Sequence, residues 1–246
     1  MLTKTSRLIA SLLVNVRSRG VLPGGQAPLS AEPVRQSGRI RVLGCACLVV
    51  CGGAAFAASS AQRDLFDEIY ARAQEQEAKL RTLHARFTET TESTLLKDPI
   101  IATGTLVAEW PMRIRLDYEN PERRTVIVDE HRLVMITPGR HERFDRDITT
   151  SQKRVRKYFV DKNAAELRNQ FTITAARDPR LQDAYRLVMT PKRKQIQEGL
   201  SELHLWLDGR TLLIRRMLMV FPDGDRRTFN LEDVKTNEPV APGVFD

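Results

Sequence analysis

The sequence predicts an α+β fold that is mainly antiparallel β-sheet, and three observations support this class. Apolar residues recur with a helical period in one long segment, residues 62–80. From Leu83 onward the chain consists of short runs rich in Thr, Val, Ile and Leu. Dipeptides typical of tight turns separate several of these runs. The pattern indicates one helix followed by strands that are joined by hairpins.

The predicted helix begins near Gln62 and ends at about Leu80. Charged and amide side chains separate its apolar positions, which form one stripe: Leu65, Phe66, Ile69, Ala73 and Leu80. Asp64 lies near the start, where a negative charge suits the helix dipole. Residues 153–170 interrupt the strand pattern, and within them residues 163–168 predict a short second helix with Asn163 as its N-cap.

Eleven runs of the sequence have the composition of strands. Their predicted bounds are Leu83–Glu92, Ile100–Trp110, Met112–Tyr118, Arg124–Asp129, Arg132–Thr137, His141–Asp147, Phe171–Ala176, Ala184–Thr190, Ser201–Asp208, Thr211–Phe221 and Arg226–Lys235. Turn residues lie at Asn120-Pro121, Pro138-Gly139, Asp208-Gly209 and Pro222-Asp223-Gly224. We expect hairpins at Asp208-Gly209 and Asp223-Gly224.

Alternation along the strands shows where apolar surface lies. Ile114, Leu116 and Tyr118 face one way, and the charged residues between them face the other. The runs 126–128 and 133–136 are apolar at every position. Strands of this kind are covered on both faces, so we expect a packed helix or a ligand on each side of them.

The N-terminal part differs in composition from the rest. Residues 1–57 hold seven basic residues and one acidic residue, which is six of the eight net positive charges. All three cysteines, Cys45, Cys47 and Cys51, lie in an apolar stretch that ends in Ala55-Phe56-Ala57, a small-x-small sequence typical of signal-peptidase sites. We predict a signal peptide at about residues 34–57 with cleavage after Ala57, and therefore a periplasmic product.

Residues 1–33 precede this signal peptide and form no long hydrophobic period, so we interpret them as an extension from a misassigned start, with Val34 as a GTG start codon. Lipidation at Cys45 is an alternative, but the apolar stretch follows that cysteine, whereas in a lipoprotein signal it precedes it. The remaining residues, 58–246, predict a single domain. Because most excess charge lies before Ala58, the pI of 9.7 does not indicate a nucleic-acid partner.

No catalytic or metal-binding motif is evident. The four histidines, His84, His131, His141 and His204, lie in separate strand regions without metal-ligand spacing. The chain has no nucleophile elbow, no P-loop and no glycine-rich dinucleotide turn. We therefore expect no enzyme activity, no metal and no cofactor. Two basic segments, residues 153–159 and 192–194, are interpreted either as solvated loops or as contacts to anionic phospholipid or a partner.

Several segments taken in order resemble a known family. They are Leu83-His84-Ala85-Arg86-Phe87, Gly104-Thr105-Leu106, the run from Pro111 to Pro121, Leu207-Asp208-Gly209, Asp223 to Phe229, Leu231 to Val234, and Asn237 to Phe245. Behind a signal peptide, this order resembles the LolA-type outer-membrane lipoprotein carriers. The resemblance runs from about Asp64 to Phe245.

The resemblance implies an incomplete, half-open β-barrel of about 11 strands with a helical lid over its concave face. It implies a carrier that receives lipoproteins from an inner-membrane releasing transporter, binds their acyl chains in an apolar groove and delivers them to the outer membrane, with an outer-membrane receptor as a further expected partner. We expect it to act as a monomer. Leu65 and Ile69 are assigned to the lid helix, and the predicted groove residues are Phe87, Leu106, Trp110, Ile114, Leu116, Tyr118, Val126, Val128, Leu133 and Met135.

One position departs from the family pattern. LolA-type carriers usually have a basic residue before the proline, where it is thought to bond the closed lid, and this chain has Trp110. Trp110 is interpreted as closing the groove by apolar contact, or as a sign of a different lipid cargo. Three alternatives therefore stay open: a secreted hydrolase acting on lipid or glycan, a general lipid-binding envelope protein, and an ordinary dry core at the groove positions.

Overall fold

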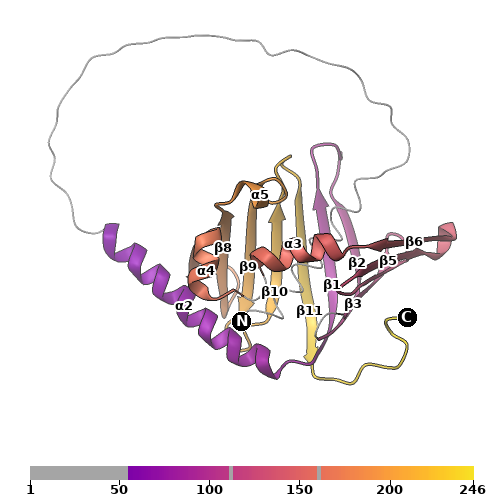
Figure 1. Ribbon diagram of the computed structural model, residues 1–246, viewed down its shortest axis with the longest axis horizontal. Helices are drawn as coiled ribbons and strands as arrows, with labels where there is room; N and C mark the ends of the chain where they lie inside the picture. The colour runs from indigo at the N-terminus through magenta and orange to yellow at the C-terminus, as the bar shows by residue number, and fades with distance from the viewer. Residues whose placement is uncertain (1–54, 111–112, 160–161) are drawn as a thin grey trace, which may run out of the picture.

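Antiparallel strands of a single sheet make up most of the computed structural model, which describes residues 55–110, 113–159 and 162–246 (Figure 1). Each strand pairs only with its sheet neighbours, in the order β6-β5-β4-β3-β2-β1-β11-β10-β9-β8-β7. Their bounds are β1 Thr82–Glu92, β2 Ile100–Glu109, β3 Arg113–Asn120, β4 Arg124–Val128, β5 Arg132–Thr137, β6 Glu142–Asp147, β7 Phe171–Arg177, β8 Ala184–Pro191, β9 Glu202–Asp208, β10 Ile214–Val220 and β11 Arg226–Thr236. Edges β6 and β7 do not pair with each other, so the barrel is open.

All eleven predicted strands are present, with ends that differ by at most a few residues. The predicted N-terminal extension and nearly all of the predicted signal peptide, residues 1–54, lie outside the described residues, as does Met112, the predicted first residue of the third strand. The Asp223-Gly224 hairpin is confirmed, since Gly224 has φ of +88° and its N–H donates to the carbonyl of Phe221.

The connection at Asp208-Gly209 is longer than the tight hairpin that the sequence predicts. Residues 209–213 separate β9 from β10, and the left-handed residue is Leu212, with φ of 57°. Gly209 allows a close approach instead, because its N–H donates to the Asp183 carbonyl at 2.6 Å and a Cβ there would lie 2.6 Å from the same oxygen. The turn prediction was therefore correct in place and wrong in geometry.

The helices are α2 (Ala55–Lys79), α3 (Thr149–Phe159), α4 (Ala164–Gln170) and the short α5 (Lys194–Gln197), with one 3₁₀ turn, η2 (Pro138–Arg140). Helix α2 begins seven residues before the predicted start and ends as expected. Helix α4 is confirmed together with its cap, because Asn163 and Glu166 form a reciprocal capping box. Among these described helices, none is long and apolar enough to cross a membrane.

Helix α3 was not predicted. Its sequence is rich in basic residues, so the segment 153–159 was interpreted as a solvated loop or as a contact to phospholipid or a partner, although Ile148, Val155 and Phe159 recur with a helical period. The carboxylate of Asp147 accepts a hydrogen bond from the Thr149 N–H at 2.7 Å and thus starts the helix where β6 ends. From there α3 crosses in front of the sheet toward α4 (Figure 1).

The two faces of the sheet differ in composition. We call the face that carries Leu106, Leu116 and Val126 the inner face, and the opposite face the outer face. The register places inner-face side chains in rows across the strands, with Leu106 opposite Leu116 and Leu116 opposite Val126. These three residues are at most 1% exposed and belong to one continuous core cluster that extends to Leu203 and Met217.

The outer face of β4 and β5 is also buried, as their uniformly apolar sequences predicted. Ile127 and Val134 are each 6% exposed and lie opposite each other in the register. Arg115 is the β3 neighbour of Ile127, and its Nη1 donates to the carbonyl of Val244 at 2.7 Å. The C-terminal segment, which forms a turn at residues 242–245, therefore lies against β3 on this face, beside the buried Ile127.

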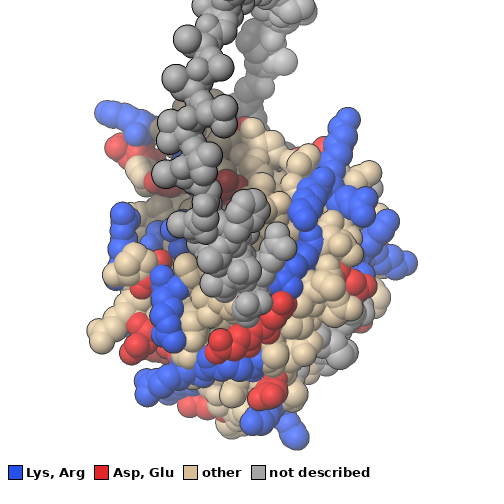
Figure 2. Space-filling model, turned by 90° about the vertical axis from the view of Figure 1, so that its left-hand side faces the viewer, with Lys and Arg blue, Asp and Glu red and all other residues tan. Residues whose placement is uncertain are grey.

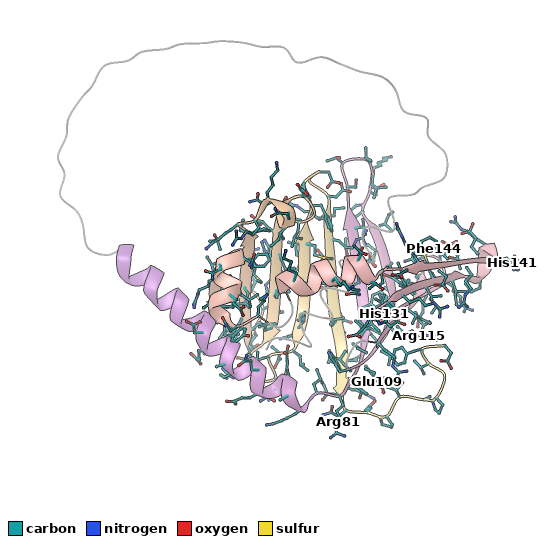
Figure 3. All side chains as sticks on the ribbon, in the orientation of Figure 1. Arg81, Glu109, Arg115, His131, His141 and Phe144 are labelled. Carbon is teal, nitrogen blue, oxygen red and sulfur yellow. The ribbon has the colours of Figure 1, made fainter. Side chains whose placement is uncertain are left out.

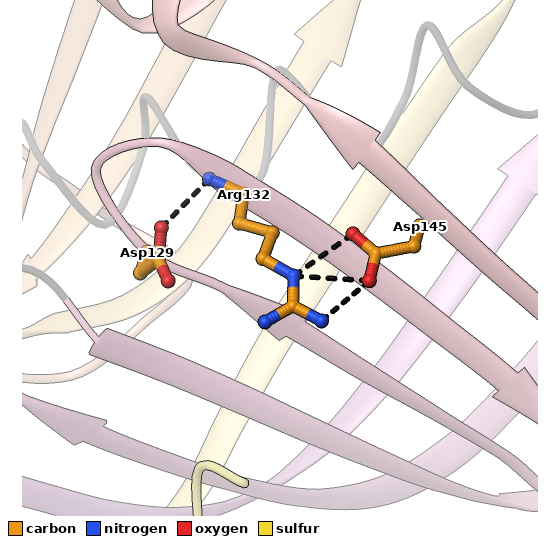
Figure 4. Close-up of polar contacts among 3 residues, drawn as sticks. All are labelled: Asp129, Arg132 and Asp145. Carbon is orange, nitrogen blue, oxygen red and sulfur yellow. Dashed lines mark hydrogen bonds and ion pairs between the residues drawn. The ribbon is translucent and has the colours of Figure 1, made fainter.

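The edge strand β6 is exposed at every position. Its charged residues protect an unpaired edge from adding another strand. Figure 4 shows how β6 is tied to β5: the guanidinium of Arg132 bonds both carboxylate oxygens of Asp145, and its own backbone N–H donates to Asp129 at 2.7 Å. The same hydrogen bond from Arg132 holds the pKa of the Asp145 carboxyl below its ordinary value.

Candidate functional site

The ten predicted groove residues are brought together on one part of the molecule. Nine lie on the inner face of β1 to β5, and Trp110 follows the end of β2 directly. A single register row joins Leu106, Leu116, Val126 and Met135 across four neighbouring strands. All ten belong to the core cluster or pack against it. Alternation in the sequence placed Ile114, Leu116 and Tyr118 on one face, and the strand register adds the residues of the uniformly apolar β4 and β5.

These residues are deeply covered in this structure. Leu116 is 1% exposed, and Val126 and Leu133 are 0% exposed. Burial of this degree is typical of an ordinary core and equally of a groove whose cover is closed. Their assignment to cargo binding therefore stays a prediction.

The two predicted lid residues lie near the opposite edge of the sheet, at β7. Ile69, 1% exposed, belongs to the core cluster, and Leu65 packs against that cluster. Helix α2, which carries both, packs mainly against the edge strand β7. Its Asp67 pairs with Arg168 of α4, with a distance of 2.6 Å between Oδ1 and Nη1. Helix α3 also crosses in front of the sheet (Figure 1), and the assignment of Leu65 and Ile69 to a lid stays a prediction.

The inner face also extends over strands that the predicted site did not include. A second row runs from Glu89 on β1 through Phe229 and Met217 to Leu205 and Leu187. The two rows meet at β1 and form one apolar surface across the sheet. The alternation of Leu203, Leu205 and Leu207 indicated an apolar face on β9 in the sequence. Only the strand order shows that this face continues the one that carries the predicted groove.

A polar group interrupts this apolar surface. Glu89 is 1% exposed, and its Oε2 accepts a hydrogen bond of 2.6 Å from the hydroxyl of Tyr118. Its Oε1 lies 3.3 Å from Nε of Arg227, which is also buried. The guanidinium of Arg124 lies over the Tyr118 ring at 4.1 Å from the ring centroid. This group was not predicted, although a carboxylate two residues after Phe87 interrupts the apolar alternation of β1.

Gly104 has a clear packing role in the family-like Gly104-Thr105-Leu106 segment. A Cβ at this position would lie 2.0 Å from the Asp117 carbonyl oxygen and 2.9 Å from Cζ of Phe87. Because glycine has no Cβ, Phe87 can pack edge-on against Tyr118, with ring centroids 4.9 Å apart and planes at 77°. The glycine is therefore needed for close packing of the inner face.

Trp110 is half-buried and packs against the core cluster. Its backbone N–H donates to the Arg81 carbonyl at 3.0 Å, which holds the end of β2 beside the start of β1. This packing agrees with the interpretation of Trp110 as an apolar contact at one end of the inner face.

The histidines do not converge. Figure 3 shows His131 at the β4–β5 turn and His141 at the far end of the β5–β6 hairpin, on the side where Phe144 is 44% exposed. His131 contacts the Thr149 hydroxyl, and His204 contacts Glu202 and Arg186. Within the described part of the chain, no group of three or more His, Cys, Asp or Glu side chains is arranged to hold a metal ion.

Charge on the surface is mixed. On the side shown in Figure 2, basic and acidic side chains are interspersed and separated by uncharged surface. Of the two basic segments, Lys153 and Lys157 are exposed on α3, and residues 192–194 lead into α5 at the ends of β8 and β9.

An open antiparallel sheet with one apolar face crossed by a helix defines the class of half-open β-barrels. The family model described as "Outer membrane lipoprotein carrier protein LolA" matches residues 78–246. The chain belongs to the LolA family. No significant match was found among curated protein sequences.

Several solved structures are similar to the chain. A LolA superfamily protein from Nitrosomonas europaea is 8% identical, with a TM-score of 0.37, covering 73% of this chain and 96% of that one. The Mycobacterium tuberculosis lipoprotein LppX is 10% identical, with a TM-score of 0.45 and coverages of 74% and 99%. MucB, in its complex with MucA from Pseudomonas aeruginosa, is 16% identical, with a TM-score of 0.45, covering 73% of this chain and 60% of that one. Similarity at this level does not carry function from one protein to another.

Proposed function

We propose that the protein is a non-enzymatic carrier in the periplasm that binds the acyl chains of lipoproteins and takes them from the inner to the outer membrane. The observation that carries the proposal is the largely apolar inner face, whose single core cluster extends from the neighbourhood of Met135 on β5 to Leu187 on β8 in a barrel that is open between β6 and β7. Membership of the LolA family supports the choice of cargo.

The physical need for such a face follows from the cargo. Each methylene that leaves water contributes about 0.8 kcal/mol, so free acyl chains aggregate or enter the nearest membrane. A carrier therefore has to offer a comparable apolar surface and also release the chains. We propose that α3 acts as the movable cover, because it crosses in front of the sheet (Figure 1) with Gln152 buried on one side and Thr150, Ser151 and Lys153 exposed on the other.

The direct test is to purify the protein from the periplasm and identify bound molecules by mass spectrometry. We expect acylated protein or peptide. Depletion of the protein from cells is expected to leave lipoproteins in the inner membrane. A sample without acylated cargo, together with unchanged lipoprotein sorting after depletion, would refute the proposal.

A second test separates a groove from a dry core. Ile114→Glu and Leu116→Glu each place a carboxylate on the inner face, where it would meet acyl chains. We expect both variants to fold and to bind an acylated peptide at least about tenfold more weakly, since a buried unpaired carboxylate is strongly disfavoured. The matched control is Ile101→Glu, at an isoleucine that is 59% exposed on β2. Unfolding of both inner-face variants would instead support an ordinary core.

General lipid binding in the envelope is a second candidate, and Trp110 favours it. In place of the basic residue of LolA-type carriers, this half-buried indole contacts the core cluster. A cover held by apolar contact alone does not require a lipoprotein. Recovery of free phospholipid and no acylated protein in the mass-spectrometry experiment would favour this candidate.

A further inference from the structure

A buried glutamine lies on the helix that crosses the inner face. Gln152 of α3 is 2% exposed. Neither its Nε2 nor its Oε1 has a hydrogen-bond partner among the residues that the structure describes. A carboxamide has two N–H donors and one acceptor oxygen, and native proteins almost always pair such groups when they bury them. An unpaired amide in this place points to a partner that the protein itself does not supply.

The position of Gln152 relative to the inner face follows from how α3 is attached. The N–H of Ile148 donates to the His131 carbonyl at 2.7 Å, in the turn between Val128 of β4 and Leu133 of β5. The N–H of Gln152 in turn donates to the Ile148 carbonyl at 2.8 Å. Gln152 therefore lies one helical turn beyond the β4–β5 end of the inner face.

The side chain of Gln152 lies on the covered side of α3. Ile148 is 3% exposed and belongs to the same core cluster as Val128 and Leu133. Residues four apart share a helix face, so Gln152 points the same way as Ile148, whereas Thr150, Ser151 and Lys153 do not share that burial. The buried carboxamide therefore lies between α3 and the apolar inner face.

We infer that Gln152 is a specificity-determining contact for the linkage of the acyl chain and that it selects acyl amides. This inference rests on the proposed function. A secondary amide offers one C=O and one N–H, which match the Nε2 donor and the Oε1 acceptor of a carboxamide. An ester of the same chain offers no N–H and leaves Oε1 unpaired, and a fatty-acid carboxylate offers only acceptors.

The test measures binding of three palmitoyl probes to the purified mature protein by displacement of a fluorescent fatty acid. The probes are a short N-palmitoylated peptide, N-palmitoylethanolamine and its ester analogue 2-hydroxyethyl palmitate, which differs from the ethanolamide only in that an oxygen replaces the N–H. We expect both amides to bind more tightly than the ester. Gln152→Leu is expected to weaken amide binding about tenfold, which corresponds to one hydrogen-bonded amide pair at about 1.4 kcal/mol per tenfold, and to change ester binding less than about threefold.

The matched control is Gln170→Leu. Gln170 ends α4, next to the opposite edge strand β7, and its Oε1 is also buried without a partner among the described residues. This variant is expected to bind all three probes as the wild type does. Equal binding of amide and ester by the wild type would overturn the inference, as would equal weakening of both by Gln152→Leu.

Stability provides an independent reading. If the carboxamide lacks a partner in the free protein, Gln152→Leu removes an unpaired polar group and the melting temperature rises or stays the same. A fall in melting temperature that Gln152→Met shares would mean that Gln152 bonds within the free protein, and would overturn the inference.

The two amide probes distinguish acylated peptide from other N-acyl lipids. Failure of all three probes to bind the wild type would refute the proposed function itself.

Discussion

The hydroxyl of Tyr118 on β3 donates a hydrogen bond of 2.6 Å to the carboxylate of Glu89 on β1, across the intervening strand β2 and within the apolar inner face. Both side chains are at most 3% exposed. Glu89 also lies 3.3 Å from Nε of Arg227 on β11. One carboxylate thus connects strands from the two ends of the chain.

Removal of this hydroxyl is expected to destabilise the fold. Tyr118→Phe keeps the ring but takes one donor from a buried carboxylate, and hydrogen bonds to charged groups contribute about 1.5–3 kcal/mol. We expect a loss of that size in the free energy of unfolding by urea. The control is Tyr185→Phe, whose hydroxyl is 3.4 Å from Nη1 of Arg72, so a loss under about 1 kcal/mol is expected. Equal effects at both sites would contradict a special role for the Glu89 bond.

Gly104 is expected to be intolerant of any side chain. Gly104→Ala places Cβ 2.0 Å from a backbone oxygen, which cannot be relieved by a rotamer change, so β2 and β3 have to separate. We expect a loss of about 3 kcal/mol or more in stability, measured as the midpoint of urea unfolding. Gly139→Ala serves as the matched change, because a Cβ there meets nothing within 4 Å. It should leave the free energy of unfolding within about 0.5 kcal/mol of the wild type.

The capping box of α4 offers a local test. Asn163→Ala removes the side-chain oxygen that accepts the Glu166 N–H at 2.8 Å. We expect a loss of about 1 kcal/mol, measured by thermal unfolding. The same substitution at Asn169, which is exposed within α4, is the control and should cost less. A neutral Asn163→Ala would show that α4 is held by its packing on β7 alone.

Acid is expected to weaken the outer face at Asp178. Burial raises the pKa of its carboxyl, but hydrogen bonds from the N–H groups of Arg180, Trp206 and Leu181 outweigh burial and bring the pKa below the ordinary value of 3.8. A folded-state pKa that is lowered contributes stability above the unfolded pKa of about 3.9. That stability is lost as the pH falls from there through the folded pKa.

The corresponding measurement uses indole fluorescence in a Trp110→Phe background, so that Trp206 reports alone. Below about pH 4 we expect the Trp206 emission to change as the 2.7 Å bond from Nε1 to Asp178 is lost. Asp178→Asn should abolish this change and show a smaller drop in urea midpoint between pH 7 and pH 3. Asp98→Asn, at an exposed position, should behave as the wild type does. An unchanged acid profile in Asp178→Asn would contradict the assignment.

Secondary structure in this chain is largely a property of local sequence. The strand bounds from Thr82 to Thr236, the helix around Ile69, the cap at Asn163 and the turn at Gly224 were all recognisable, because hydrophobic period and turn chemistry are carried by consecutive residues. Local alternation placed Ile114, Leu116 and Tyr118 on one face, whereas the groove residues of β4 and β5 were placed there by the register. Helix α3 was missed because its many basic residues favoured a loop interpretation over the helical period of Ile148, Val155 and Phe159.

Only the tertiary structure decided which strands become neighbours in the sheet. Thr88 of β1 pairs with Asn230 of β11, and that closure brings Glu89 to Arg227 and joins two separate apolar rows into one face. No local pattern encodes such a pairing. The burial of Gln152 is of the same kind, because a glutamine in a basic segment becomes notable only when the helix that carries it lies over an apolar sheet.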